Sequence, residues 1–120
     1  GLLTGKFQPG HQFEAEDVRR KNKLFEPENF ARAQQALEQL RPIAARHQVS
    51  LGNLAIAWLI AQPQTQAIVG VRNAEQACQN AAAATIQLSD SELAEISALG
   101  MAVYGPMNDG NPVMWHFESL

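Results

Sequence analysis

Basic residues are absent from this sequence after residue 72. Every lysine and arginine lies within residues 1–72, whereas residues 73–120 contain six acidic residues and no lysine or arginine. The net charge of the 120 residues is −3, which argues against a general nucleic-acid-binding protein. Any basic patch for a ligand must therefore come from the earlier part of the chain.

Cysteine and long hydrophobic runs are also scarce. Cys78 is the single cysteine, so an internal disulfide is excluded, and we expect a small buried apolar residue in a reducing cytoplasm. The longest purely apolar run, Leu54–Ala61, is far too short to span a bilayer, and no signal peptide is visible. We therefore expect a cytoplasmic protein without a membrane or nucleic-acid partner.

An initial methionine is missing as well. The sequence opens with Gly1-Leu2-Leu3-Thr4-Gly5-Lys6, a loop-like stretch that follows no other element. This opening suggests an excerpt, a cleavage product or a split gene product, and the three alternatives remain open.

Apolar residues make up 46% of the sequence, and their spacing predicts helices. The first helix has Pro27 in its first turn, where a missing N–H costs little, and a kink or break is expected at Pro42. Its apolar stripe consists of Phe30, Ala33, Leu37, Leu40 and Ala44. A second helix, apolar on all sides, is predicted over Leu51–Gln62 after the N-cap Ser50.

The next elements are a strand and two more helices. Ala67–Val71 is a short apolar run that is typical of a fully buried, parallel strand. Asn73 then caps a third helix that reaches about Ala84. The capping box Ser89–Glu92 opens a fourth helix to Leu99, where the following glycine ends it. One strand cannot form a sheet, so this order predicts a fragment of a larger α/β fold.

The end of the predicted strand has the features of a phosphate site. Gly70 lets a ligand approach the backbone, and the helix after it presents free N–H groups. Arg72 lies at this helix terminus and can hold a phosphate bidentately. Gln76 and Asn80 share its helix face, and their amides suit a nucleobase. The alternatives are a surface arginine, a capping-box glutamine and a solvated asparagine.

The segment Val69-Gly70-Val71-Arg72-Asn73-Ala74-Glu75-Gln76, with Asn80, resembles the segment after the eighth barrel strand of aldo-keto reductases. Gly1–Lys6 is similar to the family's loop after the seventh strand. Asp17-Val18-Arg19, followed by Phe25, resembles a D-x-R…F pattern. Residues 50–59 and 85–99 resemble the seventh barrel helix and the last accessory helix. Departures from the family pattern are Val69 in place of a common proline and Gln79 in place of an acid.

The resemblance implies the C-terminal third of a (β/α)8 barrel, mostly helical as an isolated chain with one short strand. Residues 1–26 would be a cofactor-covering loop, residues 27–100 the last barrel helices, strand and accessory helix, and residues 101–120 a C-terminal tail. NADP is the implied cofactor, with Arg72 on its 2′-phosphate and Arg19 on its other phosphates. The implied cofactor-binding residues are Gly1, Lys6, Arg19, Gly70, Arg72, Gln76 and Asn80.

The family's catalytic tyrosine, lysine, aspartate and histidine come from earlier strands. Here the single tyrosine, Tyr104, lies in the predicted tail, and the histidines lack metal-site spacing. We therefore expect no catalytic or metal-binding residue, and no carbonyl reduction by this chain alone. It is either part of an enzyme that reduces an aldehyde or ketone with NADPH, or a non-catalytic helical interaction module. We expect it to associate with itself or with the missing N-terminal barrel half. We expect Trp115 and Phe117 to pack against the barrel mouth or line a substrate pocket, and contact with a partner is the alternative.

Overall fold

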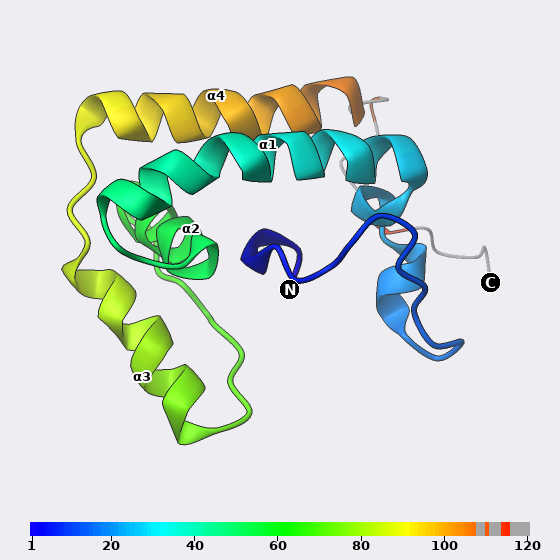
Figure 1. Ribbon diagram of the computed structural model, residues 1–120, viewed down its shortest axis with the longest axis horizontal. Helices are drawn as coiled ribbons and strands as arrows, with labels where there is room; N and C mark the ends of the chain where they lie inside the picture. The colour runs from blue at the N-terminus through cyan, green and yellow to red at the C-terminus, as the bar shows by residue number, and fades with distance from the viewer. Residues whose placement is uncertain (108–109, 111–113, 116–120) are drawn as a thin grey trace.

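The computed structural model describes residues 1–107, 110, 114 and 115, and helices dominate these residues (Figure 1). The helices are α1 (Pro27–Arg46), α2 (Leu51–Ile60), α3 (Ala74–Ala82) and α4 (Asp90–Met107). Short 3-10 helices are η1 (Leu2–Thr4), η2 (Val18–Lys21), η3 (Lys23–Phe25) and η4 (Ala83–Thr85). The predicted mostly helical chain is confirmed.

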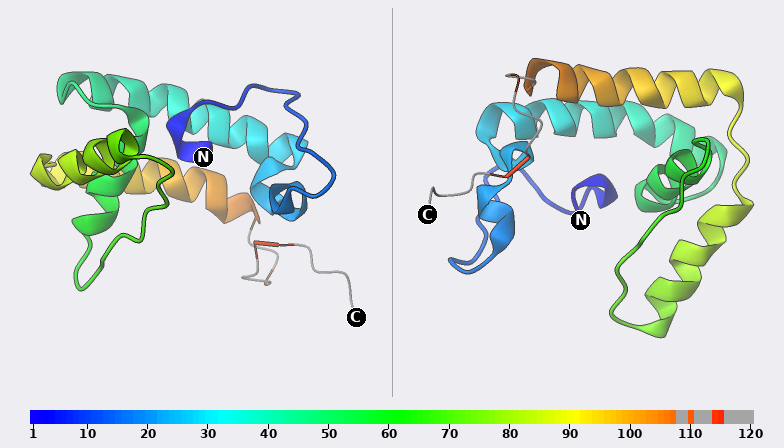
Figure 2. Two further views of the ribbon diagram at one scale, coloured as in Figure 1. Left: turned by 90° about the horizontal axis from the view of Figure 1, so that it is seen from below. Right: turned by 180° about the vertical axis from the view of Figure 1, so that it is seen from behind.

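The core lies where α1 packs along α4 and across α2 (Figures 1 and 2). The predicted stripe of α1 faces this core, because four of its five residues are buried and Leu40 is partly buried. One cluster comprises Leu37, Ile43, Ala44, Leu51, Leu54 and Ile96. A second comprises Ala33, Ala36, Val103 and Met107. Burial of these side chains is the main stabilisation that holds the three helices together.

The predicted helix starts are confirmed by their capping hydrogen bonds. The Ser50 hydroxyl accepts from Asn53 N at 3.1 Å, and Asn73 Oδ1 accepts from Gln76 N at 2.9 Å. At the start of α4, Glu92 N donates to Ser89 Oγ and Ser89 N donates to Glu92 Oε2. Each bond satisfies a backbone N–H that has no partner within its helix.

The end predicted for α4 is wrong, and of the kink or break predicted at Pro42 the break does not occur, since α1 continues to Arg46. α4 does not end at Gly100 but runs to Met107. A helical glycine costs about 1 kcal/mol relative to alanine. Beyond the glycine, Val103 and Met107 are buried against α1, so tertiary packing outweighs the local stop signal.

The predicted strand is also wrong for this chain. Residues 67–71 form no strand, and the described residues contain only one isolated antiparallel bridge, between Asn22 and Trp115. A strand needs the N–H and C=O groups of neighbouring strands, and none is present among the described residues. Ile68 is fully exposed, and Val69 and Val71 are exposed as well, so burial of this segment is not observed.

Other expectations concern single residues. Cys78 is exposed, contrary to its predicted burial, and no residue of α3 is buried. Trp115 is half-buried. Phe117, whose packing we predicted, lies outside the described residues. No helix within the described part of the chain is long and apolar enough to cross a membrane.

Candidate functional site

Aromatic side chains hold the loop that precedes α1. The ring centroids of Phe7 and Phe13 are 5.2 Å apart, and Phe25 lies 4.7 Å from Phe13, each pair meeting edge to face. Such contacts are favoured because the edge of one ring is positive and the face of the other is negative. Gln34 Nε2 donates to Phe7 O at 2.9 Å and ties the loop to α1. We call Phe7, Phe13 and Phe25 the aromatic cluster.

Three predicted site residues gather at this cluster. The Arg19 guanidinium carbon lies 4.7 Å from the Phe13 ring centroid and 5.4 Å from that of Phe7. Lys6 Nζ lies 5.0 Å from the Phe7 centroid. A Cβ atom added to Gly1 would lie 3.0 Å from Phe7 Cε2, so Gly1 also lies against this ring. The structure thus brings Gly1, Lys6 and Arg19 together.

Asp17 fixes the orientation of Arg19. Arg19 Nε donates to Asp17 Oδ1 at 2.8 Å, and Arg19 Nη2 donates to Asp17 Oδ2. The backbone N–H of Arg19 also donates to Asp17 Oδ1, at 2.9 Å. The side-chain hydrogen bond from Arg19, helped by this backbone bond, lowers the pKa of Asp17 to about 2, and the carboxylate raises the pKa of Arg19.

The second group of predicted residues lies at the start of α3. Gly70 is exposed, and no described residue other than its two chain neighbours has an atom within 4 Å of where its Cβ would be, so its backbone is open to a ligand. Arg72 is exposed two residues before α3. Its guanidinium has no hydrogen-bond or ion-pair partner within the described part of the chain. A free guanidinium beside a helix N-terminus favours an anion.

Gln76 and Asn80 lie within α3, whereas Arg72 precedes the helix, so the predicted helix face shared by all three is not formed. Asn73 Oδ1 accepts from Gln76 N, as the capping-box alternative predicts, but Gln76 Oε1 accepts from Arg72 N at 2.9 Å rather than from Asn73 N. Its Nε2 group is not used in that bond. Asn80 is half-buried and lines a hollow of about 340 Å³ with residues of α2 and the 67–71 segment.

The predicted residues therefore form two groups rather than one. Figure 1 shows the loop before α1 on one side of the molecule and α3 on the other. Sequence reasoning missed the supporting role of Phe7 and Phe13. A signal was available, because aromatic residues recur in a segment otherwise rich in glycine and charge. Asp17 belongs to the D-x-R…F pattern in the sequence, but its contact with Arg19 is seen only in the structure.

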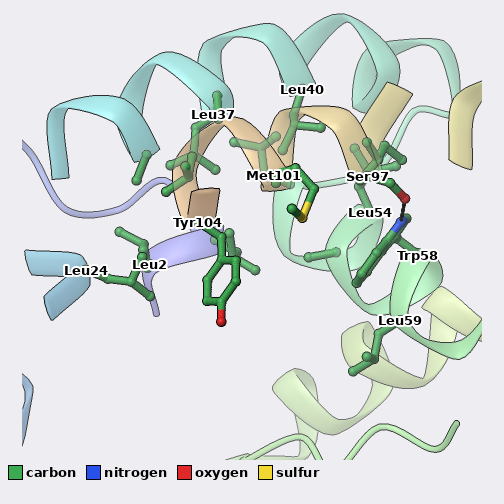
Figure 3. A pocket seen from close by; sticks show the side chains of 18 of the residues that line it. Leu2, Leu24, Leu37, Leu40, Leu54, Trp58, Leu59, Ser97, Met101 and Tyr104 are labelled. Carbon is green, nitrogen blue, oxygen red and sulfur yellow. Dashed lines mark hydrogen bonds between the residues drawn. The ribbon is translucent and has the colours of Figure 1, made fainter. Parts of the chain in front are cut away.

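An apolar hollow of about 700 Å³ opens between η1, α1, α2 and α4 (Figure 3). Its labelled lining residues are Leu2, Leu24, Leu37, Leu40, Leu54, Trp58, Leu59, Ser97, Met101 and Tyr104. The Trp58 indole N–H donates to Ser97 Oγ at 3.0 Å, so these two polar groups of the wall are hydrogen-bonded to each other. An apolar surface of this kind is suited to packing against protein rather than to binding a charged ligand.

The single tyrosine of the sequence lies elsewhere than predicted. Tyr104 lies within α4 at the hollow, not in a tail as predicted, and its hydroxyl has no hydrogen bond to the described residues. No group of three or more histidine, cysteine or acidic residues in the described part could hold a metal ion.

Comparison with known proteins decides the family. Residues 1–100 match the sequence model described as the Aldo/keto reductase family. The chain belongs to the aldo/keto reductase family. The predicted resemblance is thus confirmed, and the match extends from the Gly1 loop into α4.

Curated relatives are much longer than this aldo/keto reductase chain. Aldo-keto reductase str7 of Strobilurus tenacellus is 33% identical over 100 residues, which are 82% of this chain and 30% of the relative. Aldo-keto reductase yakc [NADP(+)] of Schizosaccharomyces pombe is 31% identical over 97 residues, 80% of this chain and 28% of the relative. The chain spans less than a third of the length of these relatives.

The relatives differ in the cofactor that their names print. The Schizosaccharomyces pombe protein is named for NADP(+), whereas a relative in Escherichia coli is named NADH-specific methylglyoxal reductase. The latter is 37% identical over 98 residues, 77% of this aldo/keto reductase chain and 28% of the relative. Family membership alone therefore leaves the choice between NADP and NAD to the residues of the site.

Proposed function

We propose that this chain is the cofactor-binding C-terminal part of an aldo/keto reductase that reduces an aldehyde or ketone with NADPH. The observation that carries the proposal is the exposed Arg72 guanidinium beside the N-terminus of α3, which has no partner among the described residues. The 2′-phosphate is the one group that separates NADP from NAD, and a planar guanidinium suits it. The cofactor would supply the hydride.

The residues present fit such a cofactor. Arg72 would hold the 2′-phosphate, and Gln76 and Asn80 would contact the adenosine. The open backbone at Gly70 leaves room for the ligand to approach. Gly1, Lys6 and Arg19 would contact the pyrophosphate from the aromatic cluster, since two of them carry positive charge and lie around one ring.

The finer part of the fold is also a proposal: this chain forms the last third of a (β/α)8 barrel when its neighbours are present. Side chains of the 67–71 segment alternate as in a strand. Ala67, Val69 and Val71 line the hollow beside α2 and α3, whereas Ile68 points away into solvent. Neighbouring strands would supply the missing backbone partners and cover Ile68.

The missing N-terminal barrel half is the partner that we propose for the 700 Å³ hollow. Its wall is apolar, and the chain covers less than a third of its relatives. That half would bring the family's catalytic residues, which the described residues lack, so the chain alone is expected to be inactive. A cytoplasmic location belongs to the same proposal.

The test is a set of dissociation constants for NADPH and NADH, measured on the protein that contains this chain at fixed salt. Arg72→Ala removes charge-assisted hydrogen bonds, so NADPH binding should weaken about ten- to a hundredfold, with NADH nearly unchanged. Arg20→Ala is the matched control, because Arg20 is also exposed but lies on η2. Equal weakening of both cofactors by Arg72→Ala would remove the main support for NADP.

A non-catalytic interaction module is the second candidate. The apolar hollow favours it, since a helical module that docks on a partner needs such a surface. The two candidates differ in one measurable respect, because a module without cofactor function has no reason to distinguish NADPH from NADH.

A further inference from the structure

Arg19 is held on three sides in this structure. Asp17 accepts from one edge of its guanidinium, through Nε at 2.8 Å and through Nη2. The ring centroids of Phe13 and Phe7 lie 4.7 and 5.4 Å from the guanidinium carbon. The Arg19 side chain is nevertheless 41% exposed, whereas that of Asp17 is 19% exposed. The guanidinium is thus fixed and still accessible.

A guanidinium has five N–H donors, of which this contact uses only part. Asp17 takes the Nε–H and an Nη2–H, so the edge formed by Nη1 and the second Nη2–H is left over. Nη1 of Arg19 makes no hydrogen bond to any other described residue. Two parallel N–H groups on one edge match two oxygens of a phosphate.

The geometry points to Asp17 as a positioning residue that orders Arg19 for the pyrophosphate of the cofactor. This inference rests on the proposed function and adds a residue to it. Asp17 touches no cofactor; it acts through Arg19. The rotamers of Arg19 are then already restricted before the pyrophosphate binds. The entropic cost of ordering the Arg19 side chain is therefore part of folding and not of binding.

Electrostatic repulsion alone would change cofactor affinity in the opposite direction from loss of positioning when Asp17 is neutralised. A carboxylate next to an anion site repels the anion, so removing its charge should tighten binding. Loss of positioning should weaken binding instead. The sign of the effect of Asp17→Asn therefore distinguishes a positioning residue from a competitor for Arg19.

The experiment measures NADPH and NADH dissociation constants on the protein that contains this chain. Asp17→Asn should weaken both cofactors about two- to tenfold, the range expected for one unrestrained long side chain. Phe13→Leu removes one flanking ring without adding charge and should also weaken both. Glu16→Gln is the matched control, since it removes the same charge from an exposed neighbouring residue and should not weaken binding.

A double-mutant cycle separates positioning from a structural role. Asp17 also caps η2 by accepting from Arg19 N, and Arg19→Ala retains that backbone N–H. If Asp17 acts through the guanidinium, adding Asp17→Asn to Arg19→Ala should cause no further loss of affinity. A further loss in that background would show that Asp17 only supports the loop, and tighter binding by Asp17→Asn alone would show competition.

Failure of this inference is distinguishable from failure of the proposed function. Wild-type protein that binds NADPH, with Arg19→Ala binding equally well, would overturn the role of Asp17 and leave the assignment of Arg72 intact. Wild-type protein that binds neither cofactor would overturn the proposed function and this inference with it. Circular dichroism on each variant verifies that the helices are retained.

Discussion

His47 joins the end of α1 to the start of α4 through Glu92. The Nε2 atom of His47 lies 3.0 Å from each carboxylate oxygen of Glu92. Arg46 Nη2 donates to the same carboxylate at 3.3 Å, and Ser89 N donates to it at 3.0 Å. The Ser89 backbone bond, followed by the His47 bond, lowers the pKa of Glu92 from 4.5 to about 2. One carboxylate thus serves a local cap and a contact between helices.

This contact predicts that the free energy of unfolding falls at acidic pH, a decrease that we call the acid limb. A lowered pKa in the folded state means that Glu92 contributes stability above pH 4.5, and that this contribution is lost as the pH falls toward about 2. Glu92→Gln retains an acceptor for Ser89 N but takes up no proton. Urea unfolding between pH 7 and pH 2 should therefore show a shallower loss of stability in Glu92→Gln than in the wild type.

Glu95→Gln is the control for that measurement, because Glu95 is exposed on the same helix. Its acid limb should match that of the wild type. The stability of Glu92→Gln should still depend on pH to some extent, because the pKa of Asp17 is also lowered to about 2. An acid limb as steep in Glu92→Gln as in the wild type would contradict the assignment.

Two isoleucines test whether residues 67–71 become a strand. Ile43 is fully buried, and Ile68 is fully exposed. In the isolated chain, Ile43→Ala should lower the free energy of unfolding by about 2–5 kcal/mol. Ile68→Ala should change it by less than about 0.5 kcal/mol. Chemical denaturation of both variants gives these values.

The same pair should behave differently in a protein that contains the whole barrel. There Ile68 would be covered, so Ile68→Ala should destabilise it by an amount comparable to Ile43→Ala. An Ile68→Ala substitution that is neutral in both settings would argue against a barrel strand at this position.

The 700 Å³ apolar hollow predicts that the chain associates with the N-terminal barrel half or with itself. Met101 is 60% exposed in its wall, and Val18 is 67% exposed but lies outside the wall. Met101→Glu places a charge in an apolar contact surface and should weaken association with the N-terminal barrel half, or self-association when that half is absent. Val18→Glu adds the same charge and should leave association unchanged. Sedimentation velocity measures both. A wild-type chain that stays a compact monomer and binds no apolar dye would contradict the docking role.

Gln76 and Asn80 test the adenosine contact. Gln76→Ala and Asn80→Ala should each weaken NADPH and NADH alike, by about two- to tenfold, because the adenosine is common to both and a neutral hydrogen bond is lost. Gln87→Ala is the control, since Gln87 is exposed and lies outside α3. Weakening of NADPH alone would instead place these side chains at the 2′-phosphate. Isothermal titration gives the constants.

Local features of the fold were predictable because their partners are close in the sequence. Ser50 and Asn73 each cap a helix through a backbone N–H three residues later. Ser89 and Glu92 satisfy each other across one turn. The apolar stripe of α1 needed only the helical period to be recognised. Arg72, Gln76 and Asn80 were predictable as one group for the same reason, because they lie close together in the sequence.

The sequence by itself determined where helices start, which face of α1 is buried, and that Arg72 is the last basic residue. Only the tertiary structure decided how far α4 extends, since the burial of Val103 and Met107 against α1 outweighs Gly100. It also decided that Gly1, Lys6 and Arg19 meet around Phe7. Residues 67–71 lack a strand here for the same reason: a strand is stabilised by hydrogen bonds to distant chain segments, and the described residues provide none.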